Sequence, residues 1–266
     1  MLKGNLYSKH FITIAQVGKI YYYRKHKFKF YFMIAQYTAK LIKNNIIAEG
    51  THQLIITKPK GFSFTPGQYA FLDFPNPMVT DESPSFRAMS IAAAPHEEHL
   101  MFIMRSSESA FKKNMMNLKD NDDIIIKGPM GHITLPQNSN QPIAFIVAGV
   151  GVTIARAIIK HEEDQRTSRQ ITLLYASRTK NSLALYDEMQ KIELDNYKAI
   201  FTLTRQEGEW EGKKGRIDEE MIKENIDDID NTMYYIVGTK EFIESMKEVL
   251  EKMGITKENT QFDNFG

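Results

Sequence analysis

The pattern of apolar and polar positions changes near residue 140. Upstream, five short segments alternate or run apolar over the length of a strand, at 37–43, 52–58, 68–74, 99–105 and 123–128. Turn residues such as Pro66-Gly67 and Pro95 separate these segments, and one helical pattern covers 110–118. Closely spaced strands of this kind predict a small antiparallel β-barrel.

Downstream, strand-like and helix-like segments alternate. Apolar runs at 143–148, 171–176, 199–204 and 234–238 are accompanied by helical patterns near 154–161, 185–192, 217–224 and 241–253. This alternation is typical of a parallel sheet with helices on both faces. The sequence therefore predicts two domains, an antiparallel β-barrel over 33–136 and an α/β doubly wound parallel-sheet domain over 141–266.

The segment VAGVGVTIAR (147–156) lies between a predicted strand and a predicted helix of the second domain. Gly149 and Gly151 let the backbone approach a ligand closely, and the following helix would direct free N–H groups at an anion. The dinucleotide-binding fingerprint has a further glycine where this chain has Ile154. Taken alone, the segment fits a phosphate site and a plain tight turn equally well.

Composition narrows the function. The chain has 266 residues and no cysteine, which excludes disulfides, thiolate zinc sites and cysteine-ligated iron–sulfur clusters within it. No apolar run is long enough to span a membrane. We expect a cytoplasmic protein. We also expect it to be a monomer and to bind no nucleic acid. Residues 1–32 carry seven Lys or Arg and no acid, and we expect this basic extension to be disordered.

Nine segments in order resemble motifs of the ferredoxin–NADP reductase family, over about residues 36–266. They are FTPGQYAFLDF (64–74), FRAMSIAAAP (86–95), MRSSESAFKKNM (104–115), KGPMGHITL (127–135), VAGVGVTIAR (147–156), LLYASRTKNSLALYDEM (173–189), FTLTRQEGEWEGKKGRI (201–217), YYIVGTKEFIESMKEVLEKMGI (234–255) and FDNFG (262–266). The resemblance implies a flavin-binding barrel followed by an NAD(P)-binding domain, and it favours the phosphate interpretation of the glycine turn.

By this resemblance, the barrel holds a flavin, FAD rather than FMN, although FMN remains possible. The residues placed at the flavin are Arg87, Ala88, Met89 and Ser90 on one segment and Arg105, Ser107, Ser109, Ala110 and Phe111 on the next. Ser90 would lie beside flavin N5, and the arginines would face the pyrophosphate. Met89 departs from the family, which usually has an aromatic residue here; a methionine can still pack on a ring or simply fill the core.

The resemblance also places a pyridine nucleotide on the second domain, at Gly149, Gly151, Thr153, Ser177, Arg178, Arg205, Gly238 and Thr239. Ser177, Arg178 and Lys180 end a predicted strand with no acid before Asp187, a pattern that favours NADPH over NADH. Val237 replaces a cysteine common in the family. Near the C-terminus, Asp263 stands where many relatives have a glutamate near the flavin, and Phe265 where an aromatic residue could shield the ring.

We therefore expect an enzyme, a flavoprotein reductase with Ser90 and Asp263 as candidate catalytic residues. It would take a hydride from NAD(P)H and pass electrons to a separate acceptor, such as ferredoxin, flavodoxin or a small oxidant. Two alternatives stay open: a ferric-chelate or flavin reductase, and a binding module without turnover. The segment His96-Glu97-Glu98-His99 lacks the spacing of a zinc helix and is interpreted as an exposed turn, so we expect no metal site.

Overall fold

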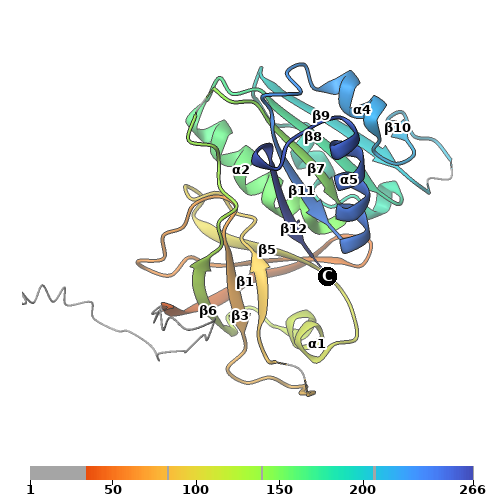
Figure 1. Ribbon diagram of the computed structural model, residues 1–266. Coiled ribbons are helices and arrows are strands. Elements are labelled where there is room, and N and C mark those ends of the chain that lie inside the picture. Colours follow the sequence, from red (N-terminus) through yellow and green to blue (C-terminus); the bar gives the residue numbers. More distant parts are fainter. Residues whose placement is uncertain (1–33, 83, 139, 206–207, 266) are drawn as a thin grey trace, which may run out of the picture.

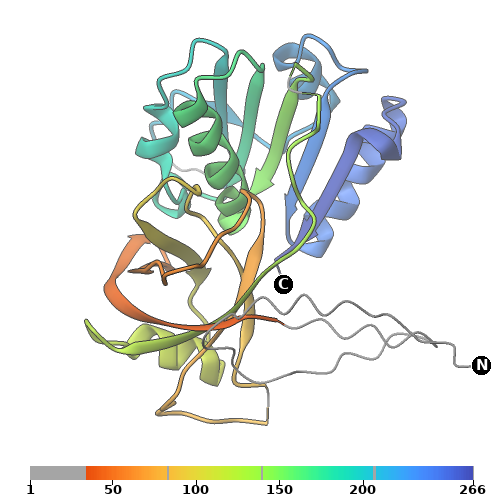
Figure 2. The ribbon, with the colours of Figure 1, turned by 90° about the vertical axis from the view of Figure 1, so that its left-hand side faces the viewer.

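The structure is a computed structural model that describes residues 34–82, 84–138, 140–205 and 208–265. The basic extension expected at 1–32 lies outside these residues. Two six-stranded sheets form two domains, which lie one above the other in Figures 1 and 2. The two-domain fold predicted from the sequence is therefore confirmed.

The first domain is an antiparallel sheet with strand order β4-β3-β6-β1-β2-β5. Its elements are β1 Gln36–Ala48, β2 Thr51–Thr57, β3 Tyr69–Asp73, β4 Arg87–Ser90, β5 His99–Arg105, α1 Ala110–Asn117 and β6 Asp123–Met130. The two edge strands come together beyond β4, where the Ala92 N–H donates to the Met101 carbonyl at 2.8 Å. The sheet is thus barrel-like, and α1 lies at the end of it that faces away from the second domain (Figure 1).

Alternating side chains fill this barrel. Leu54 and Ile56 of β2 and Phe102 of β5 are fully buried, because every second residue of a strand points to the same side. Phe111 and Met115 of α1 complete the core from below, and Phe74 packs on Phe111 with ring centroids 5.1 Å apart. Helix α1 is therefore anchored by apolar contacts, while Lys112 and Lys113 of its first turn remain partly exposed.

The second domain is a parallel sheet with strand order β10-β9-β8-β7-β11-β12. Its strands are β7 Ile143–Ala148, β8 Ile171–Ser177, β9 Tyr197–Leu203, β10 Lys213–Lys214, β11 Met233–Gly238 and β12 Thr260–Asn264. Its helices are α2 Val152–Gln165, α3 Tyr186–Gln190, α4 Glu219–Asn225 and α5 Lys240–Lys252, with short 3₁₀ turns at Gly149–Gly151, Lys180–Ser182 and Lys257–Asn259.

Both faces of this sheet are covered. Phe145 and Val147 of β7 pack with α2 and α3, whereas Ala144 and Ile146 of the same strand pack with α4 and α5. This is why the strands of the second domain are almost continuously apolar, while those of the barrel alternate. Helix α5 begins at Thr239, whose hydroxyl accepts from the Phe242 N–H at 3.4 Å, a typical N-cap.

Most predicted elements are present, with shifted ends. Helix α2 is longer than the predicted 154–161 at both ends, and α3 is shorter than the predicted 185–192. Three strands were not predicted as strands: β4, β10 and β12. Each is five residues or shorter and lies at an edge of its sheet, where hydrogen bonds to a partner matter more than a local apolar pattern. No described helix has the length and apolar character needed to cross a membrane.

Candidate functional site

Strand β4 carries the Arg87–Ser90 motif along the side of the barrel. It pairs with β3, so that Ser90 lies opposite Tyr69 and Met89 opposite Ala70. Ala88 is exposed, whereas Met89 and Ser90 are buried, and Met89 belongs to the barrel core. Ser90 is 5% exposed, and its hydroxyl has no hydrogen-bond partner among the described residues.

Three cations gather beside this strand. The Arg87 guanidinium lies over the Phe111 ring, 5.6 Å from its centroid, and donates to the Phe86 carbonyl at 2.8 Å. Burial lowers the pKa of Lys112, and the positive charges of Arg105 and Arg87 lower it further. Mutual repulsion among Arg87, Arg105 and Lys112, which we call the cation cluster, indicates a place suited to an anion.

A carboxylate occupies the first turn of α1, next to the cation cluster. Asp81 accepts a hydrogen bond from the Ala110 N–H at 3.0 Å, although it comes from the distant loop between β3 and β4. Asn114 of the same helix bonds both the N–H and the carbonyl of Val79 in that loop, at 2.8 and 2.7 Å. The helix N-terminus therefore already receives a negative group, as expected of an anion site.

The remaining predicted barrel residues lie on the same segment. Ser109 is the N-cap residue of α1 but makes no capping bond, and its hydroxyl is 3.5 Å from that of Ser107. Ala110 and Phe111 are buried, whereas Arg105 and Ser107 are exposed. The structure thus brings the predicted arginines and serines together around the start of α1. Lys112 and Asp81 belong to the same group but were missed, because nothing in the local sequence pattern distinguishes them.

The glycine turn of the second domain follows β7. Gly149 has φ +55°, and a Cβ there would meet no other atom. A Cβ on Gly151 would lie 2.4 Å from the Val237 carbonyl oxygen, so β11 passes directly behind the turn. Thr153 is buried, and its hydroxyl donates to the Val150 carbonyl at 2.6 Å. Each of these three predicted residues therefore shapes the turn from which α2 begins.

The cation cluster and the glycine turn lie near each other across the domain boundary. The end of β5 contacts the 3₁₀ turn at Gly149–Gly151. The Tyr175 hydroxyl donates to the Gly149 carbonyl at 2.9 Å. Burial raises the pKa of Tyr175, and the positive charge of Arg105 opposes that increase, which places Arg105 in electrostatic range of the turn. Arg105 is thus the member of the cation cluster that connects the barrel to the glycine turn of the second domain.

Ser177, Arg178 and Arg205 lie at the carboxyl ends of β8 and β9, the edge at which α/β sheets bind ligands. The Arg205 N–H donates to the Arg178 carbonyl at 2.8 Å, so the two arginines are neighbours, and both side chains are exposed. The Ser177 hydroxyl is 2.8 Å from that of Ser182 and supports the 3₁₀ turn below it.

The C-terminal strand returns to the boundary between the domains, where the C-terminus lies in Figures 1 and 2. In β12, Asp263 pairs with Val237, and Asn264 with Gly238. Burial raises the pKa of Asp263, and the nearby His132 opposes this. Phe265 packs on the core of the second domain, and its N–H donates to the Gly238 carbonyl at 3.0 Å.

A chain of neighbours links Asp263 to the barrel motif. His132 follows Gly131, and a Cβ on Gly131 would lie 2.9 Å from the Tyr69 ring. Tyr69 in turn pairs with Ser90. Residues 90, 69, 131, 132 and 263 therefore form a continuous path, which brings the two candidate catalytic residues toward the same boundary. The Thr239 hydroxyl, like those of Thr153 and Ser177, is engaged within the protein, in this case as the N-cap of α5.

The interpretation of residues 96–99 as an exposed turn is correct only in part. His96 and Glu98 are exposed, but Glu97 is half-buried and forms an ion pair with Arg156 of the second domain at 2.8 Å. The sequence pattern could not show this, since the partner lies 59 positions away. Among the described residues, no group of three or more His, Cys, Asp or Glu could hold a metal ion.

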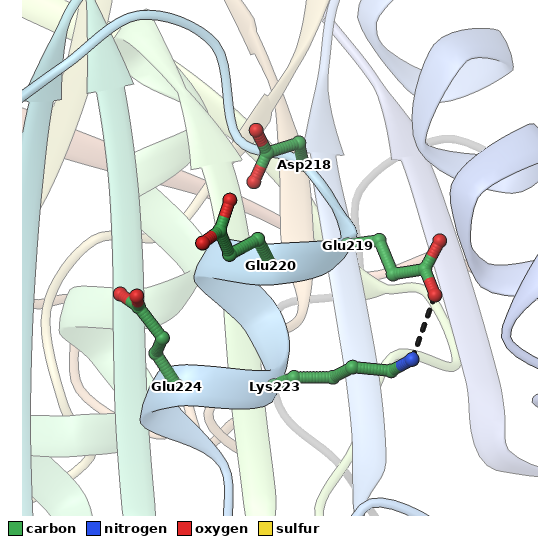
Figure 3. A pocket seen from close by; sticks show the side chains of 5 residues that line it. All are labelled: Asp218, Glu219, Glu220, Lys223 and Glu224. Atoms are coloured by element: carbon green, nitrogen blue, oxygen red, sulfur yellow. Dashed lines mark hydrogen bonds and ion pairs between the residues drawn. The ribbon is translucent and has the colours of Figure 1, made fainter.

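A hollow on the outer surface of α4 is a weaker candidate for a ligand site. It is lined by Asp218, Glu219, Glu220, Lys223 and Glu224, and Lys223 is bound to Glu219 (Figure 3). Four carboxylates would repel a dinucleotide phosphate. We therefore do not regard this hollow as the functional site.

Comparisons with known proteins agree with this geometry. Residues 145–248 match the oxidoreductase NAD-binding domain family. The chain is 24% identical over 245 residues to the ferredoxin–NAD(P)(+) reductase component of the naphthalene 1,2-dioxygenase system of Pseudomonas putida, covering 87% of this chain and 71% of that protein. It is 24% identical over 217 residues to flavohemoprotein A of Dictyostelium discoideum, covering 77% and 53%. The chain thus spans about half the length of several relatives.

Solved structures show the same fold. The FAD/NAD-binding domain of the nitric oxide dioxygenase of Vibrio cholerae superimposes with a TM-score of 0.76 at 19% identity, covering 86% of this chain and 98% of that one. A ferredoxin NADP⁺ reductase from Neisseria gonorrhoeae with bound FAD and NADP gives 0.74 at 16% identity, with coverage of 86% and 98%.

Fold and family match together describe a two-domain protein in which an antiparallel barrel precedes a domain that matches the oxidoreductase NAD-binding domain family. Its fold is that of the ferredoxin–NADP reductase family, so the resemblance seen in the sequence motifs is confirmed.

Proposed function

We propose that this protein is an NAD(P)H-dependent flavoprotein reductase that binds FAD in its barrel and delivers electrons to a separate acceptor. The observation that carries the proposal is the cation cluster beside the α1 N-terminus, together with Arg105, which links this cluster to the glycine turn of the second domain. When bound, FAD would accept a hydride from NAD(P)H and release the electrons one at a time.

The residues of the barrel fit the flavin. Arg87, Arg105 and Lys112 would neutralise its pyrophosphate, and the first N–H groups of α1 would donate to the phosphate oxygens in place of Asp81. Ala88 leaves an open strip along β4, and the free Ser90 hydroxyl would donate to the edge of the ring. Met89 would support the ring from the core side.

The second domain would hold the nucleotide. The turn at Gly149–Gly151 would bind its pyrophosphate at the start of α2, and Gly238 would let the nicotinamide approach β11 closely. Arg178 and Arg205 would face the 2′-phosphate, which makes NADPH the proposed donor in preference to NADH. Asp263 and Phe265 would close the site from the C-terminal strand. The exact domain boundaries, monomeric state and cytoplasmic location stay predictions.

The acceptor that we propose is a protein such as a ferredoxin or flavodoxin. Reductase components of oxygenase systems, such as the propane 2-monooxygenase reductase component of Rhodococcus jostii, are among the relatives that support this. A ferric-chelate or flavin reductase is the second candidate.

The decisive experiment is anaerobic spectroscopy of the purified chain. We expect a yellow protein whose pigment has the mass of FAD and whose visible absorbance bleaches on addition of NADPH. Arg87→Gln and Arg105→Gln should lose the pigment, whereas Lys113→Gln, next to Lys112 on α1 but paired with Glu108 at 2.8 Å, should retain it. A colourless protein, or a yellow one that neither NADPH nor NADH bleaches, contradicts the proposal.

A second measurement separates the acceptors. The turnover rate is measured with an excess of the reduced nucleotide. It is compared for a ferredoxin, a flavodoxin and ferric citrate, each over a range of concentrations. Saturation at low concentration by one of the proteins supports a protein acceptor. Saturation by the iron chelate alone makes the chain a ferric-chelate reductase.

A further inference from the structure

Arg156 lies buried at the boundary between the two domains. It is in the second turn of α2, three residues after Thr153, and only 4% of its side chain is exposed. One nitrogen of its guanidinium donates to the Ala92 carbonyl at 2.7 Å and to Glu97 at 2.8 Å. The other donates to Glu97 at 2.8 Å and to Glu188 of α3 at 2.7 Å.

Arg156, Glu97 and Glu188 form an ion-pair cluster that joins the two domains. The fork on Glu97 is bidentate, the arrangement that fixes a guanidinium most strictly. Burial alone would raise the pKa of Glu97, but its bonds to Arg156 and to the Ala94 N–H hold that pKa below the ordinary 4.5. Burial alone would lower the pKa of Arg156, yet Glu97 and Glu188 raise it. Both groups therefore remain charged in the folded protein.

Burial of these charged groups also has a cost in free energy. The Arg156 Nε is buried and has no hydrogen-bond partner in the described part of the chain. Burying three charges requires desolvation that their attraction barely offsets, so such clusters contribute little to stability but can specify one arrangement over others. Here the arrangement specified is the docking of α2 against the barrel.

The partners of Arg156 on the barrel side are themselves held firmly. The Glu97 carboxylate accepts from the Ala94 N–H at 2.5 Å, and the Glu97 N–H donates to the Ala94 carbonyl at 3.1 Å. The Lys58 ammonium donates to the carbonyls of Pro95 and Glu97. The tip of this hairpin is thus a rigid anchor for the arginine.

Arg156 connects the two parts of the proposed site, strand β4 of the barrel and the glycine turn of the second domain. Ala92 is two residues beyond Ser90, and Arg156 is five residues beyond Gly151. We propose that Arg156 is a positioning residue: bound to Ala92 and Glu97, it holds the nucleotide-binding turn at the distance from β4 at which nicotinamide and flavin react. This proposal rests on the function proposed above.

The chain offers a matched control in the same helix. Glu162 and Arg169 form an ion pair at 3.0 Å, and 4% of each side chain is exposed. Both belong to the second domain, and Arg169 also bonds the Asn138 and Gln141 carbonyls of the connecting segment. Substitution of Glu162 removes a charge more deeply buried than that of Glu97, whose side chain is 24% exposed, without breaking a contact between α2 and the barrel.

The first test uses calorimetry of the full chain and needs no catalytic turnover. We expect the wild type and Glu162→Gln to unfold in a single transition, and Glu97→Gln and Arg156→Met to unfold in two. Two transitions in the wild type, or one in all four proteins, overturn the proposal. Because this readout does not depend on bleaching, it remains valid if the proposed function is wrong.

The second test measures the reaction. At saturating NADPH, the bleaching rate of Glu97→Gln should fall about ten- to hundredfold, because small misplacements of the reacting groups have effects of that size. The dissociation constant for NADPH should stay within about threefold, and Arg156→Lys should recover part of the rate that Arg156→Met loses. An unchanged rate in Glu97→Gln, or an equal loss in Glu162→Gln, overturns the proposal.

Discussion

Single side chains show how charge marks the candidate site. Arg87, Arg105 and Lys112 lie close enough on the barrel to interact: burial lowers the pKa of Lys112, and the charges of Arg105 and Arg87 lower it further. Asp81 reaches back to the first turn of α1 and supplies a negative group there. Such an accumulation of like charges costs stability, so it is best understood as preparation for an anionic ligand.

Arg178 tests the preference for NADPH. Replacing it with alanine should weaken NADPH binding about ten- to hundredfold, since a hydrogen bond to a charged group contributes about 1.5–3 kcal/mol, while NADH binding should hardly change. Equilibrium titration of both nucleotides measures this. Lys198→Ala, at the opposite end of the sheet, is the control and should affect neither nucleotide. Equal weakening of both nucleotides by Arg178→Ala would refute the assignment.

Asp263 tests the electrostatics of the C-terminal strand. Burial raises its pKa above the ordinary 3.8, so the ionised carboxylate destabilises the folded state at neutral pH. Asp263→Asn should therefore melt at a higher temperature than the wild type at about pH 7, and this difference should vanish as the pH falls below 3.8. Melting curves of both proteins across this pH range measure the difference in melting temperature. A lower melting temperature at neutral pH would mean that the carboxylate has a stabilising partner.

At the scale of elements, the turn between β7 and α2 shows two glycines with different requirements. Gly149 needs a positive φ of 55°, whereas Gly151 needs space, because the Val237 carbonyl lies directly behind it. The sequence pattern identified both positions but not this difference, which depends on β11 being the neighbour of β7.

These requirements predict different tolerances. Gly149→Asn should be nearly neutral, because asparagine adopts the left-handed conformation at little cost. Gly151→Ala should destabilise the protein by about 1–3 kcal/mol, as overpacking does. Urea unfolding of both variants measures the difference. If Gly151→Ala unfolds at the wild-type midpoint, β11 does not pass as close to the turn as described.

At the scale of the whole molecule, function depends on how the two domains are held together. Arg156 contacts a hairpin of the barrel, and the Tyr235 hydroxyl donates to the Thr134 carbonyl at 2.7 Å. The Glu49 N–H also donates to the Asn181 carbonyl at 2.8 Å. The boundary is therefore bridged by polar groups from several elements rather than by apolar packing alone.

Acid should weaken this arrangement. The pKa of Glu97 is below its ordinary value, so its stabilisation is complete above pH 4.5 and is lost as the pH falls through the lowered value. Arg156, Glu188 and His96 face it, and Asp164 lies 3.6 Å from His96. Urea midpoints at about pH 7 and about pH 3 should differ less for Glu97→Gln than for the wild type. An identical pH dependence would show that Glu97 contributes nothing to docking.

The accuracy with which the sequence predicts the secondary structure differs between elements. Long periodic segments such as those of α5 and β8 were predicted within a few residues, because each buries its own apolar face. Strand β4 was not predicted, although its residues were singled out as a motif. Four residues at a sheet edge have too weak a pattern, and their pairing with β3 determines their structure.

By itself, the sequence determined the two-domain fold, the position of the glycine turn and the chemical types available to the candidate site. Periodicity, turn residues and motif spacing are local properties, because they depend only on residues that are close in sequence. Only the tertiary structure decided that Asp81 lies on the first turn of α1 and that Glu97 holds Arg156. Those contacts join segments 29 and 59 positions apart, and they form only when both sheets have folded and their surfaces meet.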